Sequence, residues 1–373
     1  MTAVPASLLA LLEAVVRNGA SDLHLRPNVT PKLRISGSLV PLGDRPVPHA
    51  ELSAVLRETM DPDVRASFDQ RYEADYALSV PGVGRFRVNA FRTRGEEGCV
   101  MRLVGDAPAT LAQLGMPEAV GTLALRPRGL VLVTGPTGSG KTTTLAAMID
   151  LVNENRSVHI LTLEDPIEIL HRDKRATVTQ RELGSDTRDW PSALRAAMRQ
   201  DPDVILIGEL RDTATVQAAL SAAETGHAVF ASMHTTDARE TVLRLVEFFA
   251  PHEQGRIRAA LGAALEGVVC QRLVPRADGG GRVCAMEIAV RDARFAEAVA
   301  DPEKTSSIPD ILAAGAFSGM QTFDQHLIEL VSSGAIDVDT AAMSASNPHD
   351  FSVMLRRTGW TPGATLQRVE QGA

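Results

Sequence analysis

The stretch GLVLVTGPTGSGKTTTLAAMIDLV, residues 129–152, joins an apolar strand, a glycine-rich loop and a helix. Its loop, Gly135–Thr142, matches the pattern G-x-x-x-x-G-K-[ST] that cradles nucleotide phosphates. The predicted strand Leu130–Val133 leads into this loop, and the predicted helix Thr143–Val152 follows it. Because an ordinary glycine-rich turn seldom carries the whole string in this context, the stretch predicts nucleotide binding.

The residues of this loop have distinct predicted roles toward ATP and Mg²⁺. Glycines allow successive backbone N–H groups to turn toward one anion, and the helix N-terminus adds its dipole. Lys141 is expected to reach the β- and γ-phosphates, and the Thr142 hydroxyl is expected to bind Mg²⁺. The predicted nucleotide-binding residues of the loop are Gly135, Pro136, Thr137, Gly138, Ser139, Gly140, Lys141, Thr142 and Thr143.

Apolar runs further along the chain predict the rest of this fold. They are His159–Leu163, Val204–Ile207 and Ala228–Met233. Runs that are apolar at nearly every position suit a parallel sheet covered by helices on both faces. The pattern therefore predicts an α/β fold with a doubly wound parallel sheet.

Carboxylates end two of these strands. Glu209 follows Gly208, which stands where many P-loop proteins carry the aspartate that serves Mg²⁺. Glu209 is therefore the candidate for polarising the attacking water, and a carboxylate for the metal must come from elsewhere. Glu164, at the end of the run His159–Leu163, is the candidate for that role, directly or through water. Which of Glu164 and Glu209 is the general base stays open, and each also has the plainer interpretation of a solvated carboxylate.

Two histidines flank the run Ala228–Met233. His234 follows it and lies at the same edge as the phosphate loop if the strands are parallel, where it can contact the γ-phosphate. His227 precedes the run, and both a nucleotide-binding role and a structural hydrogen-bonding role stay open for it. Two histidines without a third convergent ligand do not indicate a metal site.

A segment before the phosphate loop alternates with period two. In Gly84–Arg92, Arg85, Arg87 and Asn89 share one face, while the apolar residues between them share the other. The polar face is either solvated or presents arginines that stabilise phosphate charge at a neighbour's active site. The spacing alone does not decide between these two interpretations.

Changes in pattern divide the 373 residues into four predicted parts. A small α+β unit covers 1–105 and a linker covers 106–122. The doubly wound domain covers 123–290, and a helical segment covers 291–373. Loops of the helical segment are expected at Pro302, Pro309 and Gly334.

Composition excludes several classes of protein. The 38 basic and 46 acidic residues give a net charge of −8, which argues against direct binding of nucleic acid or anionic lipid. The three cysteines form no C-x-x-C pair, which excludes a disulfide framework and a four-thiolate zinc site and suits a reducing cytoplasm. No signal peptide is recognised and no 18 apolar residues are consecutive, so we expect association with a membrane only through a partner.

Four boxes, which lie in residues 135–150, 160–171, 199–212 and 222–236, together resemble the secretion-ATPase superfamily of P-loop proteins. They read GPTGSGKTTTLAAMID, ILTLEDPIEILH, RQDPDVILIGELRD and AAETGHAVFASMHTT. Three more segments are most similar to the PilT-like type IV pilus retraction ATPases: ASDLHL (20–25), VPGVGRFRVNAF (80–91) and GMQTFDQ (319–325). The resemblance covers nearly the whole chain.

This resemblance implies a PAS-like N-terminal domain, a RecA-like ATPase domain and a ring of six subunits. It implies that nucleotide lies between the two domains and that arginines of the N-terminal domain complete the site, for which Arg85 and Arg87 are the matching residues. The remaining matches are Lys141 and Thr142 in the Walker A box, Glu164 in the acidic box, Glu209 in the Walker B box, and His227 and His234 in the histidine box.

The implied function is a hexameric motor that hydrolyses Mg-ATP to power type IV pilus retraction, and with it twitching motility or DNA uptake. The implied partners are five further copies of the chain, an inner-membrane platform protein of the pilus, and a paralogous pilus ATPase. The implied location is the cytoplasmic side of the membrane, without insertion into it.

Two departures from related families bear on the direction of movement. Pilus-extension and type II secretion ATPases usually carry an extra N-terminal domain and a tetracysteine metal site, and this sequence has neither, which favours retraction. Retraction ATPases typically carry an AIRNLIRE-like helix, which Asp292–Val299 matches poorly. An accessory retraction paralogue or an assembly ATPase therefore stays an alternative, as does, from another class, a P-loop small-molecule kinase.

Overall fold

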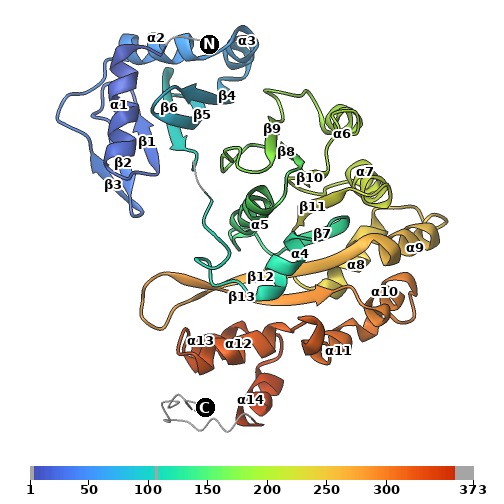
Figure 1. Ribbon diagram of the computed structural model, residues 1–373. Coiled ribbons are helices and arrows are strands. Elements are labelled where there is room, and N and C mark those ends of the chain that lie inside the picture. Colours follow the sequence, from blue (N-terminus) through green and yellow to red (C-terminus); the bar gives the residue numbers. More distant parts are fainter. Residues whose placement is uncertain (1–3, 106–107, 358–373) are drawn as a thin grey trace. The chain divides into compact units, whose positions relative to one another are not determined.

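The computed structural model describes residues 4–105 and 108–357 (Figure 1). The described residues form two compact units. The first consists of 4–105 together with Ile167–Leu170, and the second consists of 108–166 and 171–357. The inclusion of Ile167–Leu170 in the first unit is a feature that the sequence pattern does not indicate.

The first unit is a six-stranded antiparallel sheet in the order β3-β2-β1-β6-β5-β4. Its strands are β1 (Asp22–Leu25), β2 (Lys32–Ile35), β3 (Ser38–Pro41), β4 (Glu73–Val80), β5 (Gly84–Thr93) and β6 (Glu96–Leu103), and its helices are α1 (Ala6–Arg17), α2 (His49–Thr59) and α3 (Pro62–Arg71). The alternation predicted for β5 is confirmed, because Phe86, Val88 and Ala90 are fully buried while Arg87 is exposed.

The second unit is built on a seven-stranded sheet in the order β13-β12-β7-β11-β10-β8-β9. Its strands are β7 (Gly129–Thr134), β8 (His159–Glu164), β9 (Thr177–Glu182), β10 (Val204–Ile207), β11 (Ala228–Met233), β12 (Leu265–Pro275) and β13 (Arg282–Val290). Strands β7 to β12 are parallel, as predicted, and β13 is added antiparallel along β12 at the edge.

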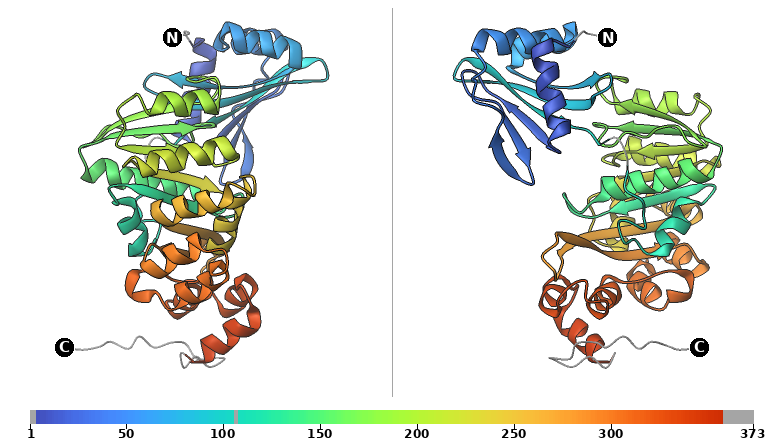
Figure 2. Two further views of the ribbon diagram at one scale, coloured as in Figure 1. Left: turned by 90° about the vertical axis from the view of Figure 1, so that its right-hand side faces the viewer. Right: turned by 60° about the vertical axis from the view of Figure 1, so that its left-hand side comes forward.

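Helices cover both faces of this sheet (Figure 2). They are α4 (Glu118–Ala124), α5 (Lys141–Asn155), α6 (Trp190–Ala197), α7 (Thr213–Glu224), α8 (Ala238–Glu247) and α9 (Gln254–Ala264). The chain then continues as α10 (Ala293–Ala300), η1 (Thr305–Ser307), α11 (Ile308–Ala313), η2 (Ala316–Ser318), α12 (Phe323–Ser332), α13 (Val338–Ser344) and α14 (Pro348–Arg357). The loop predicted at Pro309 is wrong: this proline lies in the first turn of α11, where a missing N–H costs no intrahelical bond.

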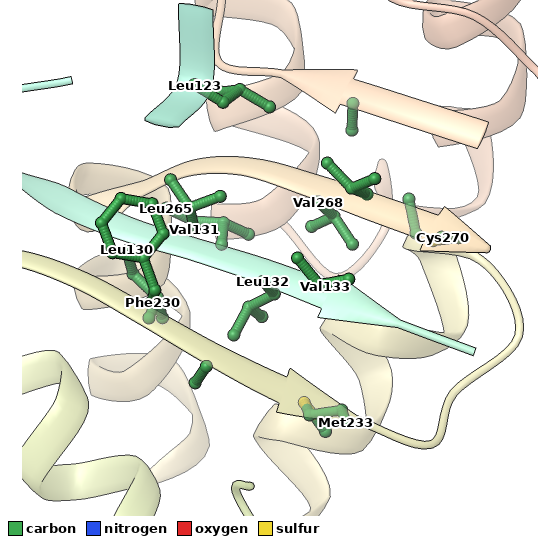
Figure 3. Close-up of a cluster of buried hydrophobic side chains, with 14 of the residues drawn as sticks. Leu123, Leu130, Val131, Leu132, Val133, Phe230, Met233, Leu265, Val268 and Cys270 are labelled. Carbon is green, nitrogen blue, oxygen red and sulfur yellow. The ribbon is translucent and has the colours of Figure 1, made fainter. Parts of the chain in front are cut away.

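The core of the second unit lies along its central strands (Figure 3). Leu130, Leu132, Val133, Phe230 and Val268 project from β7, β11 and β12 and are at most 1% exposed. Full burial of each such side chain contributes about 1.5–3 kcal/mol. The strand that leads into the phosphate loop is therefore among the most firmly held elements of the unit.

No helix within residues 4–105 and 108–357 combines the length and the apolar character needed to span a lipid bilayer.

Candidate active site

The phosphate loop leaves the carboxyl end of β7 and enters α5. Gly135, Gly138 and Gly140 have φ values of +143°, +78° and +91°, which side chains rarely tolerate. A Cβ at Gly135 would lie 2.4 Å from the Gln271 carbonyl oxygen and 2.6 Å from Ser139 Oγ. Glycine at 135 is therefore required both by the backbone conformation and by the close approach of β12.

The start of α5 suits an anion. Gly140 is its N-cap residue and has no side chain to accept from the first N–H groups of this 15-residue helix. The helix dipole adds positive potential at the same end. The Thr142 side chain lies in the first turn and is exposed. These features fit a bound phosphate with a hydroxyl beside it for Mg²⁺.

The Lys141 side chain folds back over its own loop. Its Nζ donates to the Gly135 carbonyl oxygen at 2.7 Å and to the Pro136 carbonyl oxygen at 3.1 Å, and lies 3.4 Å from His234 Nδ1. A phosphate oxygen is a stronger acceptor for an ammonium group than a neutral carbonyl. We therefore expect the Lys141 ammonium group to leave these carbonyl oxygens for a phosphate oxygen when a nucleotide binds.

Glu209, His234 and Lys141 form one connected group. Glu209 Oε1 lies 3.1 Å from His234 Nε2, whose ring contacts Lys141 through its other nitrogen. Glu209 is 19% exposed and His234 is 51% exposed, so the group faces solvent at the edge that holds the phosphate loop. The expectation that His234 lies at that edge is confirmed by the parallel pairing of β11 with β7.

Arg211 is a member of this group that the sequence reasoning missed. Its Nε and Nη2 lie 2.9 and 2.8 Å from Glu209 Oε2, so both oxygens of the Glu209 carboxylate are engaged. No strand period indicates this contact, because residues 209–211 lie in the loop between β10 and α7.

Glu164 also lies at this edge. The register pairs Ile207 with Leu163, which places Gly208 beside Glu164. Glu164 is buried, and its Oε1 accepts from Thr162 Oγ1 at 2.6 Å and from Gln180 Nε2 at 3.1 Å. A Cβ at Gly208 would lie 3.3 Å from the Leu163 carbonyl oxygen and 3.5 Å from Glu164 Cα, so β8 leaves little room for the missing aspartate.

His227 lies at the opposite edge of the sheet from the phosphate loop. It precedes Ala228, which pairs with Gly129 at the start of β7. Its Nδ1 lies 2.9 Å from the Ala222 carbonyl oxygen and 3.1 Å from Thr225 Oγ1. The structure does not bring His227 together with the phosphate loop of its own chain, and these contacts give it a structural role in the turn after α7.

Arg85 and Arg87 belong to β5 in the first unit. The Arg85 Nη1 donates to Ser79 Oγ at 3.3 Å, and Arg87 is exposed beside Arg102 of the neighbouring strand. Arg102 is itself paired with Asp22, whose Oδ1 accepts from the Arg102 Nε at 2.7 Å. The Arg87 guanidinium is accessible to solvent on this face of β5.

Within the described part of the chain, no three His, Cys, Asp or Glu side chains gather in a way that could hold a metal ion. The Thr142 hydroxyl and the Glu164 carboxylate are oxygen donors of the type that Mg²⁺ prefers. They fit a Mg²⁺ ion that takes its other ligands from phosphate oxygens and water, as P-loop sites do.

Comparisons with known proteins identify the family of the chain. The family model for Type II/IV secretion system proteins matches residues 2–339. The type IV pilus retraction ATPase PilT of Pseudomonas aeruginosa is 42% identical over 341 residues, covering 91% of this chain and 98% of the relative. The type IV pilus ATPase PilU of the same organism is 36% identical over 362 residues, covering 97% and 94%.

Among solved structures, the crystal structure of the pilus retraction motor PilT with bound ADP has a TM-score of 0.85 and 38% identity, covering 93% of this chain and 99% of the other. Both the family model and the identity extend over most of the chain. The chain therefore belongs to the Type II/IV secretion system protein family and is an ATPase of the pilus retraction type.

Proposed function

We propose that this ATPase works as a ring of six identical chains that draws pilin subunits out of a type IV pilus and into the membrane. The observation that carries the hydrolysis step is the connected group of Lys141, His234 and Glu209 at the phosphate loop. The direction of movement is supported by the 42% identity to a retraction ATPase.

In this proposal ATP is the substrate of the phosphate loop. Residues 135–143 hold its phosphates through backbone N–H groups and Lys141, and Thr142 and, through water, Glu164 are the residues that would hold Mg²⁺. When bound, Mg²⁺ neutralises charge on the β- and γ-phosphate oxygens. Glu209 orients and polarises the attacking water, and its connection through His234 to Lys141 of the phosphate loop favours this role over Glu164, whose Oε1 is engaged by Thr162 and Gln180.

His234 is proposed to report the γ-phosphate to the rest of the ring. Its ring lies between Glu209 and Lys141, at 3.1 Å and 3.4 Å. When Lys141 turns to a phosphate, its contact with His234 is lost, and the imidazole is released toward the γ-phosphate. Hydrolysis and phosphate release reverse this exchange. The loop that carries His234 therefore has two arrangements, one with the γ-phosphate bound and one without it.

The first unit is proposed to be a PAS-like domain whose arginines act on ATP in an interface that the ring completes. Arg85 and Arg87 stabilise charge that develops on the γ-phosphate, so their loss lowers turnover far more than ATP binding. In mixtures of Arg87→Ala and Glu209→Gln chains, some interfaces pair an intact arginine with an intact Glu209. Recovered ATPase activity in such mixed rings supports action between chains, and wild-type turnover in Arg85→Ala and Arg87→Ala hexamers refutes it.

The motor is proposed to work through an inner-membrane platform protein at the cytoplasmic face of the membrane, without inserting into it. A particle of about six times the 39.8 kDa chain mass is expected in solution. Deleting the gene should leave cells with surplus surface pili that do not withdraw. Cells without pili would instead indicate an extension motor.

A second candidate is an accessory retraction ATPase that assists a paralogue. It is favoured by one observation, the poor match of α10 to the helix typical of retraction motors. PilU, which is 36% identical over 97% of the chain, is a type IV pilus ATPase of the organism that also has PilT, and such a pair of ATPases is what this second candidate requires. Retraction that persists in the deletion strain, and stops only when a paralogue's gene is also removed, would assign the accessory role.

A further inference from the structure

The N-terminus of α8 is held by a buried carboxylate from a distant strand. Glu287, on β13, is 8% exposed, and its Oε1 accepts from the Ala238 N–H at 2.8 Å. Ala238 is the first residue of α8, and its N–H is one of the four that a helix leaves without an internal partner. Glu287 therefore supplies an acceptor that the helix does not have by itself.

The loop that carries His234 is fastened to the same end of α8. Thr235 Oγ1 lies 2.7 Å from Thr241 Oγ1. The Thr236 N–H and hydroxyl donate to Glu240 at 2.7 and 2.6 Å. Because these three bonds join the loop to the first turn of α8, displacement of that turn displaces His234 as well.

Strand β13, which carries Glu287, is held on its outer edge by the C-terminal segment (Figure 1). The Met286 N–H donates to His326 Nδ1 of α12 at 2.9 Å, and Ile288 exchanges two backbone bonds with Gln321 at 2.9 and 3.0 Å. Burial lowers the pKa of His326 to about 4, so this imidazole is a neutral acceptor near pH 7. Glu287 lies between these two attachments.

We propose that Glu287 is a positioning residue for ATP hydrolysis. Gln321 and His326 of the C-terminal segment hold β13 in place, and Glu287 links β13 to α8 and thereby to the loop that carries His234. This rests on the proposed role of His234 beside Glu209. It predicts that the charge of one carboxylate, in no contact with nucleotide, sets how firmly the γ-phosphate-sensing loop is held.

The surroundings of Glu287 make its charge adjustable near neutral pH. Burial is the main cause that raises its pKa to about 7. The neighbouring carboxylates also raise it, while the N–H of Ala238 and a guanidinium lower it. The ionisable groups that face it are Asp237 before α8, Cys270 and Arg272 on β12, and Asp324 on α12, while His326 of α12 contacts the neighbouring Met286 N–H. Below about pH 7 the carboxyl is neutral, and above it a carboxylate faces the helix N-terminus.

The test compares the wild-type chain with Glu287→Gln, which keeps an oxygen acceptor and removes the charge. Burial disfavours the ionised carboxyl, so the hold on α8 weakens as pH rises through about 7, and the ratio of the wild-type kcat to that of the variant should fall about fivefold between pH 6 and pH 8. KM for ATP should stay within twofold. Glu266→Gln is the matched control, because Glu266 is 15% exposed and pairs with Arg126 and Arg291, and its kcat ratio to the wild type should not change with pH.

Amide hydrogen exchange of the first turn of α8 provides a readout that needs no turnover. After correction for intrinsic exchange, protection of this turn in the wild type should fall relative to that in Glu287→Gln by up to about tenfold between pH 6 and pH 8, because water that reaches the Ala238 N–H also hydrates the ionised Glu287. A kcat ratio or a protection ratio that does not change with pH overturns the proposal. If the wild type does not hydrolyse ATP, the assignment of the site is refuted, and the exchange data still decide whether Glu287 holds the loop.

Discussion

Replacing Arg211 with alanine should slow ATP hydrolysis without weakening nucleotide binding. Arg211 contacts Glu209 Oε2 through both Nε and Nη2, at 2.9 and 2.8 Å, while His234 contacts the other carboxylate oxygen at 3.1 Å. With Arg211 removed, Glu209 keeps one partner and gains rotational freedom about its side-chain bonds. A carboxylate that must be ordered again in each cycle polarises water less effectively.

The size of this effect follows from the geometry and the exposure of the pair. A hydrogen bond to a charged group contributes about 1.5–3 kcal/mol. The Arg211 side chain is 55% exposed and Glu209 is 19% exposed, so water screens the pair and reduces this to roughly 1–1.5 kcal/mol. Since about 1.4 kcal/mol corresponds to a factor of ten in rate, kcat should fall about 5- to 15-fold.

The assay is single-turnover hydrolysis at saturating ATP, alongside nucleotide affinity measured by titration. Arg211→Lys should recover part of the rate, because lysine restores the charge but not the two-nitrogen contact. Arg244→Ala is the control: Arg244 pairs with Glu247 at 3.4 Å on the exposed side of α8, where both side chains are more than half exposed, and its loss should leave kcat unchanged. Wild-type kcat in Arg211→Ala, with intact affinity and fold, would refute the view that this pair orients Glu209.

Three further predictions concern the phosphate loop and the base. Lys141→Ala should abolish ATP binding or turnover in a steady-state assay, because no other lysine lies in the loop. Glu209→Gln should keep ATP affinity and stop single-turnover hydrolysis, since an amide is a poor base; a wild-type rate would transfer the role to another carboxylate. Gly135→Ala should lower the free energy of unfolding by about 2–4 kcal/mol, from backbone strain plus the 2.4 Å approach to a carbonyl oxygen. Gly138→Ala, with open space around its Cβ, should cost about 1 kcal/mol by chemical denaturation.

Local patterns predicted the parts of this site that lie next to one another in the sequence. The strand, loop and helix around Lys141 were predictable because one continuous string determines all three. The edge shared by Glu209 and His234 was predictable because each follows a buried strand of a parallel sheet. The burial alternation of β5 followed from the period of two.

Besides the contact of Arg211 with Glu209, sequence reasoning missed two contacts that join residues far apart in the chain. Gln271, on β12, donates to Thr144 Oγ1 at 2.9 Å across a separation of 127 residues, and Glu287 reaches Ala238 across 49. Neither glutamine nor glutamate in a strand has a local pattern that indicates a partner on a distant helix. Both residues lie on the β12–β13 pair, whose antiparallel addition at the sheet edge was not predicted. These two long-range contacts therefore have one common origin, the β12–β13 hairpin, which was not predicted.

The two histidines of the histidine box lie close together in the sequence, but the topology of the sheet places them at opposite edges. His227 and His234 flank the six residues of β11. A strand rises about 3.3 Å per residue, so the two rings are separated by roughly 20 Å along the sheet. Only the histidine at the carboxyl end can meet the phosphate loop of its own chain, because the loop leaves the carboxyl end of the parallel neighbour β7. Any effect of His227→Ala on turnover must therefore pass through the turn after α7, where its ring contacts Ala222 and Thr225, or through a nucleotide held by another chain.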